Sequence, residues 1–328
     1  MNIEKNHLVI KTALSPRLIY AARIKGIARA MRPRQWTKNG AVFVGIVFSQ
    51  RLFSLVAIER ALLAFVIFCL ASSSVYLLND LFDMQYDRQH PTKKLRPFAS
   101  GLVPVHWGLI AIMLLLLLCA GLLLILFQPS LRPYHDVFAK VGGANILFTL
   151  TIIVYITLMA CYSGYLKHVA LLDVFIIASG FVLRIFAGAI VIAVSISPWL
   201  YLVTCFLSLF LAFSKRRYEL ILLQEQAEHH RLTLKEYNVA MLDQVITIVV
   251  TGTIIAYSIY TIEGPTKNHL LVLTIPFVLY GILRYLYLMH MHKGGGSPEE
   301  VLLRDTHVRA SVVLCVLFVI TLLYFVPV

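Results

Sequence analysis

Charged residues are scarce in this 328-residue chain, and acidic ones are the scarcest. Asp and Glu occupy only 16 positions and charged residues of both signs 14%, whereas hydrophobic residues make up 59%. The mean hydropathy is +0.82. A water-soluble domain of this length needs a more polar surface, so the composition excludes that class and indicates a polytopic membrane protein.

Cysteine is also rare, and its distribution excludes two kinds of site. The five cysteines all lie in apolar runs without paired spacing, so we expect neither a disulfide framework nor a zinc site. The basic N-terminus lacks a short apolar stretch followed by a cleavage site, so no removable signal peptide is expected. The first apolar runs should instead serve as insertion signals.

Nine apolar runs approach the length needed to cross a bilayer, the first being the shortest. They cover residues 41–57, 61–78, 107–127, 144–161, 171–194, 198–213, 245–262, 270–289 and 310–328. Roughly 20 consecutive apolar residues predict a membrane-spanning helix, and the apolar character of these runs is continuous instead of alternating. The sequence therefore predicts an all-α bundle of about nine transmembrane helices.

Lys and Arg lie mostly on one side of the predicted membrane. Of the 29, 22 fall in the N-terminal segment and in the loops after the second, fourth, sixth and eighth runs, against five on the opposite side. The positive-inside rule makes the richer side cytoplasmic. This predicts a multi-pass protein of the plasma membrane with its N-terminus in the cytoplasm and its C-terminus outside.

The net charge of +13 favours anionic lipid headgroups and phosphorylated substrates as partners. Nucleic acid is not expected, because no separate soluble basic domain exists. We expect a cytoplasmic basic segment at residues 1–38 and a membrane domain at residues 39–328. Between residues 17 and 34 basic side chains are mixed with Leu, Ile and Met, a pattern typical of an amphipathic helix at the membrane surface.

Three of the few carboxylates come directly after the second apolar run. Asp80, Asp83 and Asp87 are spaced i, i+3, i+7, which on a helix places them on one face. Like charges repel there unless a cation lies among them. Because Mg²⁺ combines a few carboxylates with phosphate oxygens, the spacing predicts a metal-bridged diphosphate at the membrane surface. The alternative is a solvated acidic helix end.

Cations occupy the equivalent position after the sixth run. Lys215 and Arg216, with Lys167 from an earlier loop, are candidate phosphate ligands, since Arg binds phosphate oxygens in pairs and Lys acts as a point charge. The alternative is a positive-inside stop signal. Glu219 is either the helical partner of Lys215 or a metal contact.

Two charges lie inside the run 171–194. Asp173 and Arg184 are eleven residues apart and nearly on one helical face, and charges at membrane depth usually line a cavity. Arg184 is a candidate ligand for a substrate phosphate, and Asp173 for a ribose hydroxyl or Lys167. Structural pairing through neighbouring helices is the alternative.

Four stretches together resemble the UbiA superfamily of intramembrane prenyltransferases. They are residues 32–39, 79–87, 88–101 and 162–167, and the resemblance extends over nearly the whole chain. Leu172 to Gly188 and Lys215 to Leu220 look most like the branch that transfers 5-phosphoribose from phosphoribosyl pyrophosphate to a polyprenyl, decaprenyl-type phosphate. The expected fold is then a UbiA-like bundle.

The resemblance implies a Mg²⁺-dependent phosphoribosyltransferase, with Mn²⁺ as the alternative metal, that supplies precursors of cell-wall arabinan or a related glycan. It implies that Asp80, Asp83 and Asp87 hold the metal and are catalytic. The implied substrate-binding residues are Lys38, Asn79, Lys93, Arg96, Tyr162, Lys167, Asp173, Arg184, Lys215, Arg216 and Glu219. Asn79 is otherwise a helix cap, and Tyr162 an interfacial aromatic residue. The oligomeric state stays open, a homo-oligomer included.

Two other functions compete with this interpretation. An aromatic prenyltransferase of quinone or haem biosynthesis would carry a second acidic motif after the sixth run, where this chain has Lys215-Arg216-Arg217. A transporter would fit the many spans and the intramembrane charges. The acidic cluster at the surface and the lack of paired, broken helices at matching depths count against it.

Overall fold

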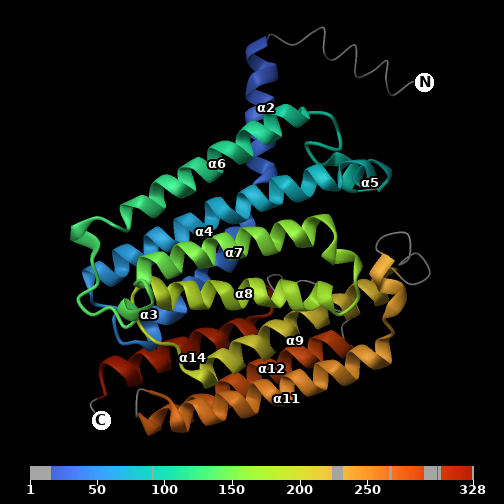
Figure 1. Ribbon diagram of the computed structural model, residues 1–328. Coiled ribbons are helices and arrows are strands. Elements are labelled where there is room, and N and C mark those ends of the chain that lie inside the picture. The colour runs from blue at the N-terminus through green and yellow to red at the C-terminus, as the bar shows by residue number, and fades with distance from the viewer. Residues whose placement is uncertain are drawn as a thin grey trace. The chain divides into compact units, whose positions relative to one another are not determined.

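The computed structural model describes residues 16–90, 92–223, 232–265, 268–291, 301 and 304–326, and all regular structure in these ranges is helical (Figure 1). Within them, eight helical segments are long and apolar enough to cross a membrane. They are α4 (Leu55–Phe82), α6 (Val105–Ile125), α7 (Ala144–Gly164), α8 (Leu172–Val191), α9 (Pro198–Leu223), α11 (Val239–Glu263), α12 (Ile275–Met291) preceded by η8 (His269–Thr274), and α14 (Thr306–Tyr324). The expected all-α, multi-pass membrane fold is confirmed.

The first predicted span, residues 41–57, is not a single helix. It starts in the 3₁₀ helix η1 (Pro33–Phe43), passes through the short α3 (Val44–Phe48) and ends inside α4. The chain turns at Gln50, whose φ of +56° is a left-handed value that the pattern of apolar residues does not predict. The predicted number of nine is therefore approximate.

The chain divides into two compact units, and α4 contributes to both. The first unit comprises Met1–Thr37 and Cys69–Gly121. It contains α2 (Pro16–Ala30), the second half of α4, α5 (Met84–Gln89) and α6. Its core packs Leu77, Phe98, Val103 and Leu115. This core fixes the loop after α5 against α4 and α6.

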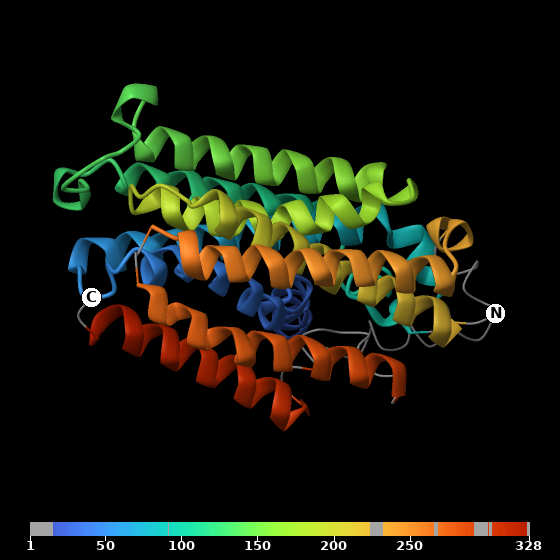
Figure 2. The ribbon, with the colours of Figure 1, turned by 90° about the horizontal axis from the view of Figure 1, so that it is seen from below.

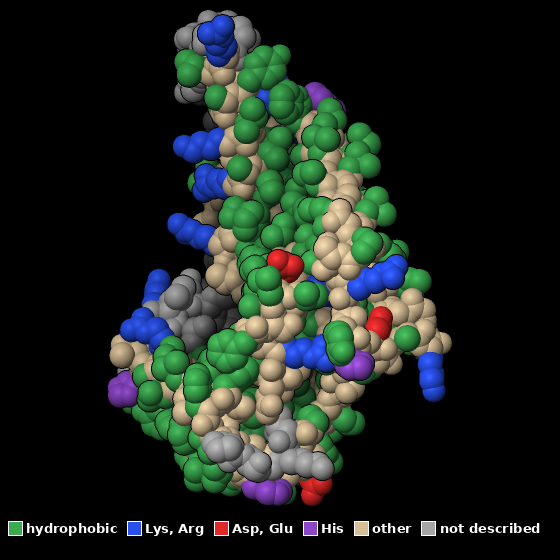
Figure 3. Space-filling model, turned by 90° about the vertical axis from the view of Figure 1, so that its left-hand side faces the viewer, with side chains coloured by type: hydrophobic (Ala, Val, Ile, Leu, Met, Phe, Trp, Pro, Cys, Tyr) green, Lys and Arg blue, Asp and Glu red, His purple; other side chains and the backbone are tan. Residues whose placement is uncertain are grey.

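Helix α2 presents a basic and apolar surface. On the face shown in Figure 3, blue Lys and Arg side chains line one side of this uppermost helix, next to green hydrophobic ones. Leu18, Tyr20 and Ile24 are exposed. Arg23 lies 5.8 Å from the ring centroid of Trp107 on α6. Most of the segment expected at the membrane surface is thus helical, with both basic and apolar side chains exposed.

The second unit comprises Lys38–Phe68 and Leu122–Val328. Its helices lie side by side in Figures 1 and 2, with α8 packed between α7 and α9, and α9 along α11. Phe210, Phe213, Leu242 and Tyr285 are buried in its core. This packing buries the starts of α8 and α11 beside the end of α9.

Glycine allows an unusually close approach of η1 to α8. A Cβ atom added at Gly188 would overlap the backbone carbonyl of Val42, and one added at Gly45 would lie 3.0 Å from the backbone of Ala189. Backbone atoms cannot move aside as a side chain can. The contact therefore depends on the missing side chain.

Replacing Gly188 by Ala is expected to destabilise the fold by about 1–3 kcal/mol, since an overpacked contact must push η1 away from α8. The measurement is the midpoint of thermal unfolding of the purified protein in detergent. Gly121→Ala on α6 is the control, because its Cβ would have nothing within 4 Å. Equal losses in the two variants would contradict the prediction.

Candidate active site

The acidic motif lies where α4 gives way to α5. Asp83 stands at the junction in a right-handed conformation, with φ −83° and ψ −2°. Its N–H donates to the carbonyl of Asn79 at 2.9 Å, and the N–H of Asp87 donates to the carbonyl of Asp83 at 2.8 Å. The helical phase thus continues through the junction and keeps Asp80 and Asp87 on related faces.

Two arginines bind the outer pair of carboxylates. Nη1 of Arg96 lies 2.7 Å from Oδ2 of Asp87 and 3.4 Å from Oδ1 of Asp80. Nη2 of Arg32 lies 2.5 Å from the same Oδ1 of Asp80. Asp80 and Asp87 are only 3% and 4% exposed. Buried carboxylates need such partners, and here both share one guanidinium.

Asp83 has a different environment. Its Oδ2 accepts a hydrogen bond from Nδ2 of Asn79 at 3.0 Å, one helical turn earlier. Among the alternatives for Asn79, the structure thus has it orient a carboxylate of the motif, not cap a helix. Asp83 is half-buried.

The residues fit a divalent cation whose remaining ligands come from a substrate. In the part of the chain that the structure describes, no group of three or more His, Cys, Asp or Glu side chains is placed to hold a metal ion, so the expected triad of Asp80, Asp83 and Asp87 is not brought together as a three-carboxylate site. Asp80 and Asp87 nevertheless converge on one positive group, Nη1 of Arg96. Mg²⁺ usually binds one or two carboxylates together with phosphate oxygens of a substrate, so it does not require a closed cage of protein ligands.

Arg32 is a residue of this site that the sequence did not single out. It lies between α2 and η1 with φ +53°, a strained value for an arginine. Its guanidinium also lies 5.0 Å from the ring centroid of Tyr76. Its sequence signal was its place directly before Pro33 in the stretch 32–39. Nothing in that stretch revealed its partner 48 residues away.

A second charged network is buried in the other unit. Arg216 on α9 donates from Nε to Oδ2 of Asp173 at 2.8 Å and from Nη1 to Oε2 of Glu219 at 2.5 Å. The side chains of Arg216 and Asp173 are 2% and 0% exposed. Arg216 was expected to bind a substrate phosphate; in the structure it is buried and has two carboxylate partners within the protein. Glu219 contacts Arg216, a partner that neither sequence alternative included.

Tyr237 completes this network and was also missed. Its hydroxyl donates to Oδ1 of Asp173 at 2.8 Å and accepts from the N–H of Leu171 at 2.6 Å. Leu171 has φ +63°, so this hydrogen bond holds a strained residue at the start of α8. Burial raises the pKa of the Tyr237 phenol, so it keeps the proton that it donates. No motif surrounds Tyr237 in the sequence.

Arg184 is buried among neutral partners. Its Nε donates to Oδ1 of Asn39 at 2.7 Å, Nη1 to the carbonyl of Gly180 at 2.6 Å and Nη2 to the hydroxyl of Tyr155 at 2.8 Å. Its guanidinium also lies 4.9 Å from the ring centroid of Tyr155. These contacts hold η1 and α7 to α8, so the structural alternative describes Arg184 better than a substrate phosphate does.

The remaining candidates lie on short 3₁₀ helices or on α7 and α9. Lys93 lies in η2 (Lys93–Leu95), Lys167 in η5 (Leu166–His168) and Tyr162 in the last turn of α7. Tyr162 is near enough to Arg216 to interact with its charge. Lys38 is half-buried in η1, and Lys215 is exposed on α9. None of these positions contradicts a role in binding phosphate.

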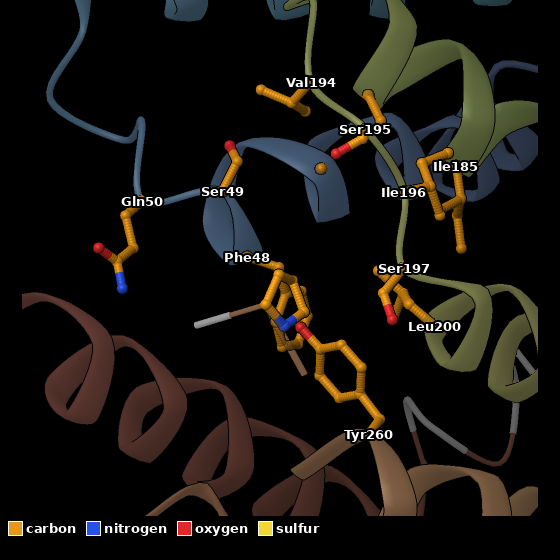
Figure 4. A pocket seen from close by; sticks show the side chains of 13 residues that line it. Phe48, Ser49, Gln50, Ile185, Val194, Ser195, Ile196, Ser197, Leu200 and Tyr260 are labelled. Atoms are coloured by element: carbon orange, nitrogen blue, oxygen red, sulfur yellow. The ribbon is translucent and has the colours of Figure 1, made fainter. Parts of the chain in front are cut away.

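A cavity of about 300 Å³ lies at the other end of the second unit. Figure 4 shows Ser49 and Gln50 after α3, Ser195 and Ser197 between α8 and α9, and Tyr260 from α11 around it. Its lining contains no Lys, Arg, Asp or Glu. Because a diphosphate needs counter-charges, this cavity is not part of the charged site.

A family model described as the UbiA prenyltransferase family matches residues 40–299. The chain belongs to the UbiA prenyltransferase family. This confirms the resemblance read from residues 32–39 and 79–101.

Curated relatives agree with this assignment. The chain is 35% identical to a decaprenyl-phosphate phosphoribosyltransferase of Mycolicibacterium smegmatis, over 86% of this chain and 87% of that protein. It is 31% identical to a protein of the same name from Corynebacterium glutamicum, over 92% of this chain and 88% of that one.

Solved structures share the fold. A UbiA homolog from Archaeoglobus fulgidus, bound to GPP and Mg²⁺, superimposes with a TM-score of 0.64 over 91% of this chain and 99% of its own, at 15% identity. At that identity the likeness concerns the UbiA fold alone. It confirms the arrangement of helices, and that neighbour binds a divalent metal.

Proposed function

We propose that this chain transfers 5-phosphoribose from phosphoribosyl pyrophosphate to a polyprenyl phosphate of the decaprenyl type. The observation that carries the proposal is its similarity, along most of both chains, to relatives named decaprenyl-phosphate phosphoribosyltransferase. The exchange of a second acidic motif for Lys215-Arg216-Arg217 supports it. Two phosphorylated substrates bring more negative charge than one prenyl diphosphate, and the exposed Lys215 is the cation proposed to offset it, since Arg216 and Arg217 pair with carboxylates of the protein.

The chemistry follows from the residues of the acidic site. Asp80 and Asp87 would hold Mg²⁺, which when bound neutralises the diphosphate leaving group. The bond from the anomeric carbon to the diphosphate oxygen breaks, and a bond to an oxygen of the acceptor phosphate forms. Since that oxygen is already anionic, no side chain has to remove a proton. The protein contributes charge and positioning.

The second network has a proposed role within its own unit. Arg216 acts as a positioning residue, since Asp173 and Glu219 hold its guanidinium. Lys167 in η5 and the exposed Lys215 on α9 are the proposed phosphate ligands of this unit. By pairing with Asp173 at the start of α8, Arg216 would hold in place the part of α9 that carries Lys215.

The orientation is proposed from charge. The excess of Lys and Arg puts the N-terminus and the acidic site on the cytoplasmic side of the plasma membrane. Eight long helices in the described part of the chain, together with one further crossing by η1 and α3, would then put the C-terminus outside. Residues 1–38 form the basic segment, in which α2 lies on anionic lipid. Phosphoribosyl pyrophosphate, a soluble cytoplasmic compound, then meets a lipid acceptor at the membrane surface.

The proposal is tested with purified protein, polyprenyl phosphate, Mg²⁺ and phosphoribosyl pyrophosphate labelled in its ribose. We expect the label to enter the lipid phase, and to stay in water when the chelator EDTA removes the metal. An aromatic prenyltransferase is the second candidate, because a structural neighbour binds GPP. Label that stays aqueous, together with prenylation of an aromatic acid, would reverse the order.

A further inference from the structure

The arginines of the acidic site occupy the oxygens that a metal ion would need. Oδ1 of Asp80 is contacted by both Nη2 of Arg32 and Nη1 of Arg96. Oδ2 of Asp87 is contacted by Nη1 of Arg96. A divalent cation on the same carboxylates would stand beside two positive groups. Cation and guanidinium therefore compete for one pair of carboxylates.

A diphosphate changes this competition. Its oxygens suit the forked guanidinium as well as a carboxylate does. Once such an anion is present, each arginine can leave its carboxylate without losing a charged partner. The carboxylate oxygens are then available to the cation, and the total charge of the site stays balanced.

We propose that Arg32 and Arg96 are exchangeable counter-ions, which pair with Asp80 and Asp87 in the resting protein and move to the diphosphate when the cation binds. The site then takes up metal and diphosphate together, and binds either one alone poorly. This inference deepens the proposed function, since it concerns the same carboxylates. It depends on a diphosphate donor, and does not require that the donor carry phosphoribose.

Exposure separates these arginines from the structural ones. The side chains of Arg32 and Arg96 are 30% and 28% exposed, against 2% for Arg216. Arg96 follows η2 in an extended conformation, and Arg32 stands at the corner between α2 and η1. Both lie on irregular backbone, where a long side chain can change its direction. Arg216 on α9 is enclosed and cannot.

Arg32 is a better residue than any on a helix for detecting this exchange, because its backbone conformation depends on its contacts. Its backbone has φ +53°, a value that costs energy in a non-glycine residue and persists only when contacts enforce it. The ion pair with Asp80 and the ring of Tyr76 supply such contacts. The corner therefore aims the guanidinium at the carboxylate.

The test compares Arg32→Gln with the unchanged full-length protein in detergent. Mn²⁺ alone is titrated and the free ion is counted by electron paramagnetic resonance; preformed Mn²⁺–pyrophosphate is then titrated by calorimetry. We expect Mn²⁺ alone to bind about fivefold more tightly to the variant, because its competitor is gone. The pyrophosphate complex should bind about tenfold more weakly, because its partner is gone. Opposite shifts are the signature.

Two further variants keep the test decisive. Arg96→Gln should show the same opposite shifts, so the inference stays testable if Arg32→Gln does not fold. Arg23→Gln removes a cation that packs on Trp107 and should move neither affinity. Replacing an arginine that has only a structural role would weaken both affinities or change neither. Unchanged or weaker binding of Mn²⁺ alone in the folded variants would overturn the exchange.

The inference and the proposed function fail in different ways. Opposite shifts without transfer of labelled ribose would keep the exchange and remove the phosphoribosyl donor. Transfer of ribose without opposite shifts would keep the function and remove the exchange. Pyrophosphate serves as the probe because it presents the diphosphate without the sugar.

Discussion

Replacing Asp80 by Asn is expected to reduce transfer of labelled ribose to lipid by about a thousandfold or more. Asp80 accepts hydrogen bonds from both Arg32 and Arg96, and it is one of the two carboxylates that would hold Mg²⁺. Loss of a charge that stabilises the leaving group typically costs two to three orders of magnitude, and loss of the metal adds to that. The measurement is kcat at saturating concentrations of both substrates.

A matched control lies on the same helix. Glu59→Gln makes the equivalent change from carboxylate to amide at an exposed position of α4, and should leave kcat within about twofold, as expected for a surface substitution away from the site. Unfolding midpoints of both variants should stay close to that of the unchanged protein. Retention of more than about a tenth of the activity by Asp80→Asn would show that the metal site lies elsewhere.

The fold was predictable because lipid restricts the choice. A chain that crosses a bilayer must satisfy its backbone hydrogen bonds within each segment, so long apolar runs predict helices. The prediction was wrong at the first run, where η1 and α3 replace a single span. The left-handed turn at Gln50 depends on how the chain packs, and composition does not record it.

The candidate site was predictable only where its members are close in sequence. The spacing of Asp80 and Asp87 follows from helical geometry, and Arg96 comes soon after them. Arg32 and Tyr237 could not be found this way, since their partners are 48 and 64 residues distant. Such contacts arise from packing of helices. For the same reason Arg184, a plausible phosphate ligand in sequence, is a buried link to Asn39 and Tyr155.

Replacing Asp173 by Ala is expected to destabilise the protein by about 3–5 kcal/mol, the typical cost of leaving one member of a buried ion pair behind. Arg216 would keep Glu219 but lose its enclosed partner, and Tyr237 would lose its acceptor. The measurement is thermal or chemical unfolding in detergent. Glu59→Ala is the control, because Glu59 is exposed on α4 and a surface substitution usually changes stability by no more than about 0.5 kcal/mol.

A double variant separates stability from function in this network. Asp173→Leu combined with Arg216→Met replaces the ion pair by apolar groups, which often restores what a single removal costs. We expect most of the lost stability to return, while transfer stays impaired because the proposed positioning charge beside Lys215 is gone. Full activity in the stable double variant would make the pair purely structural. A single Asp173→Ala variant as stable as the unchanged protein would contradict the buried pair itself.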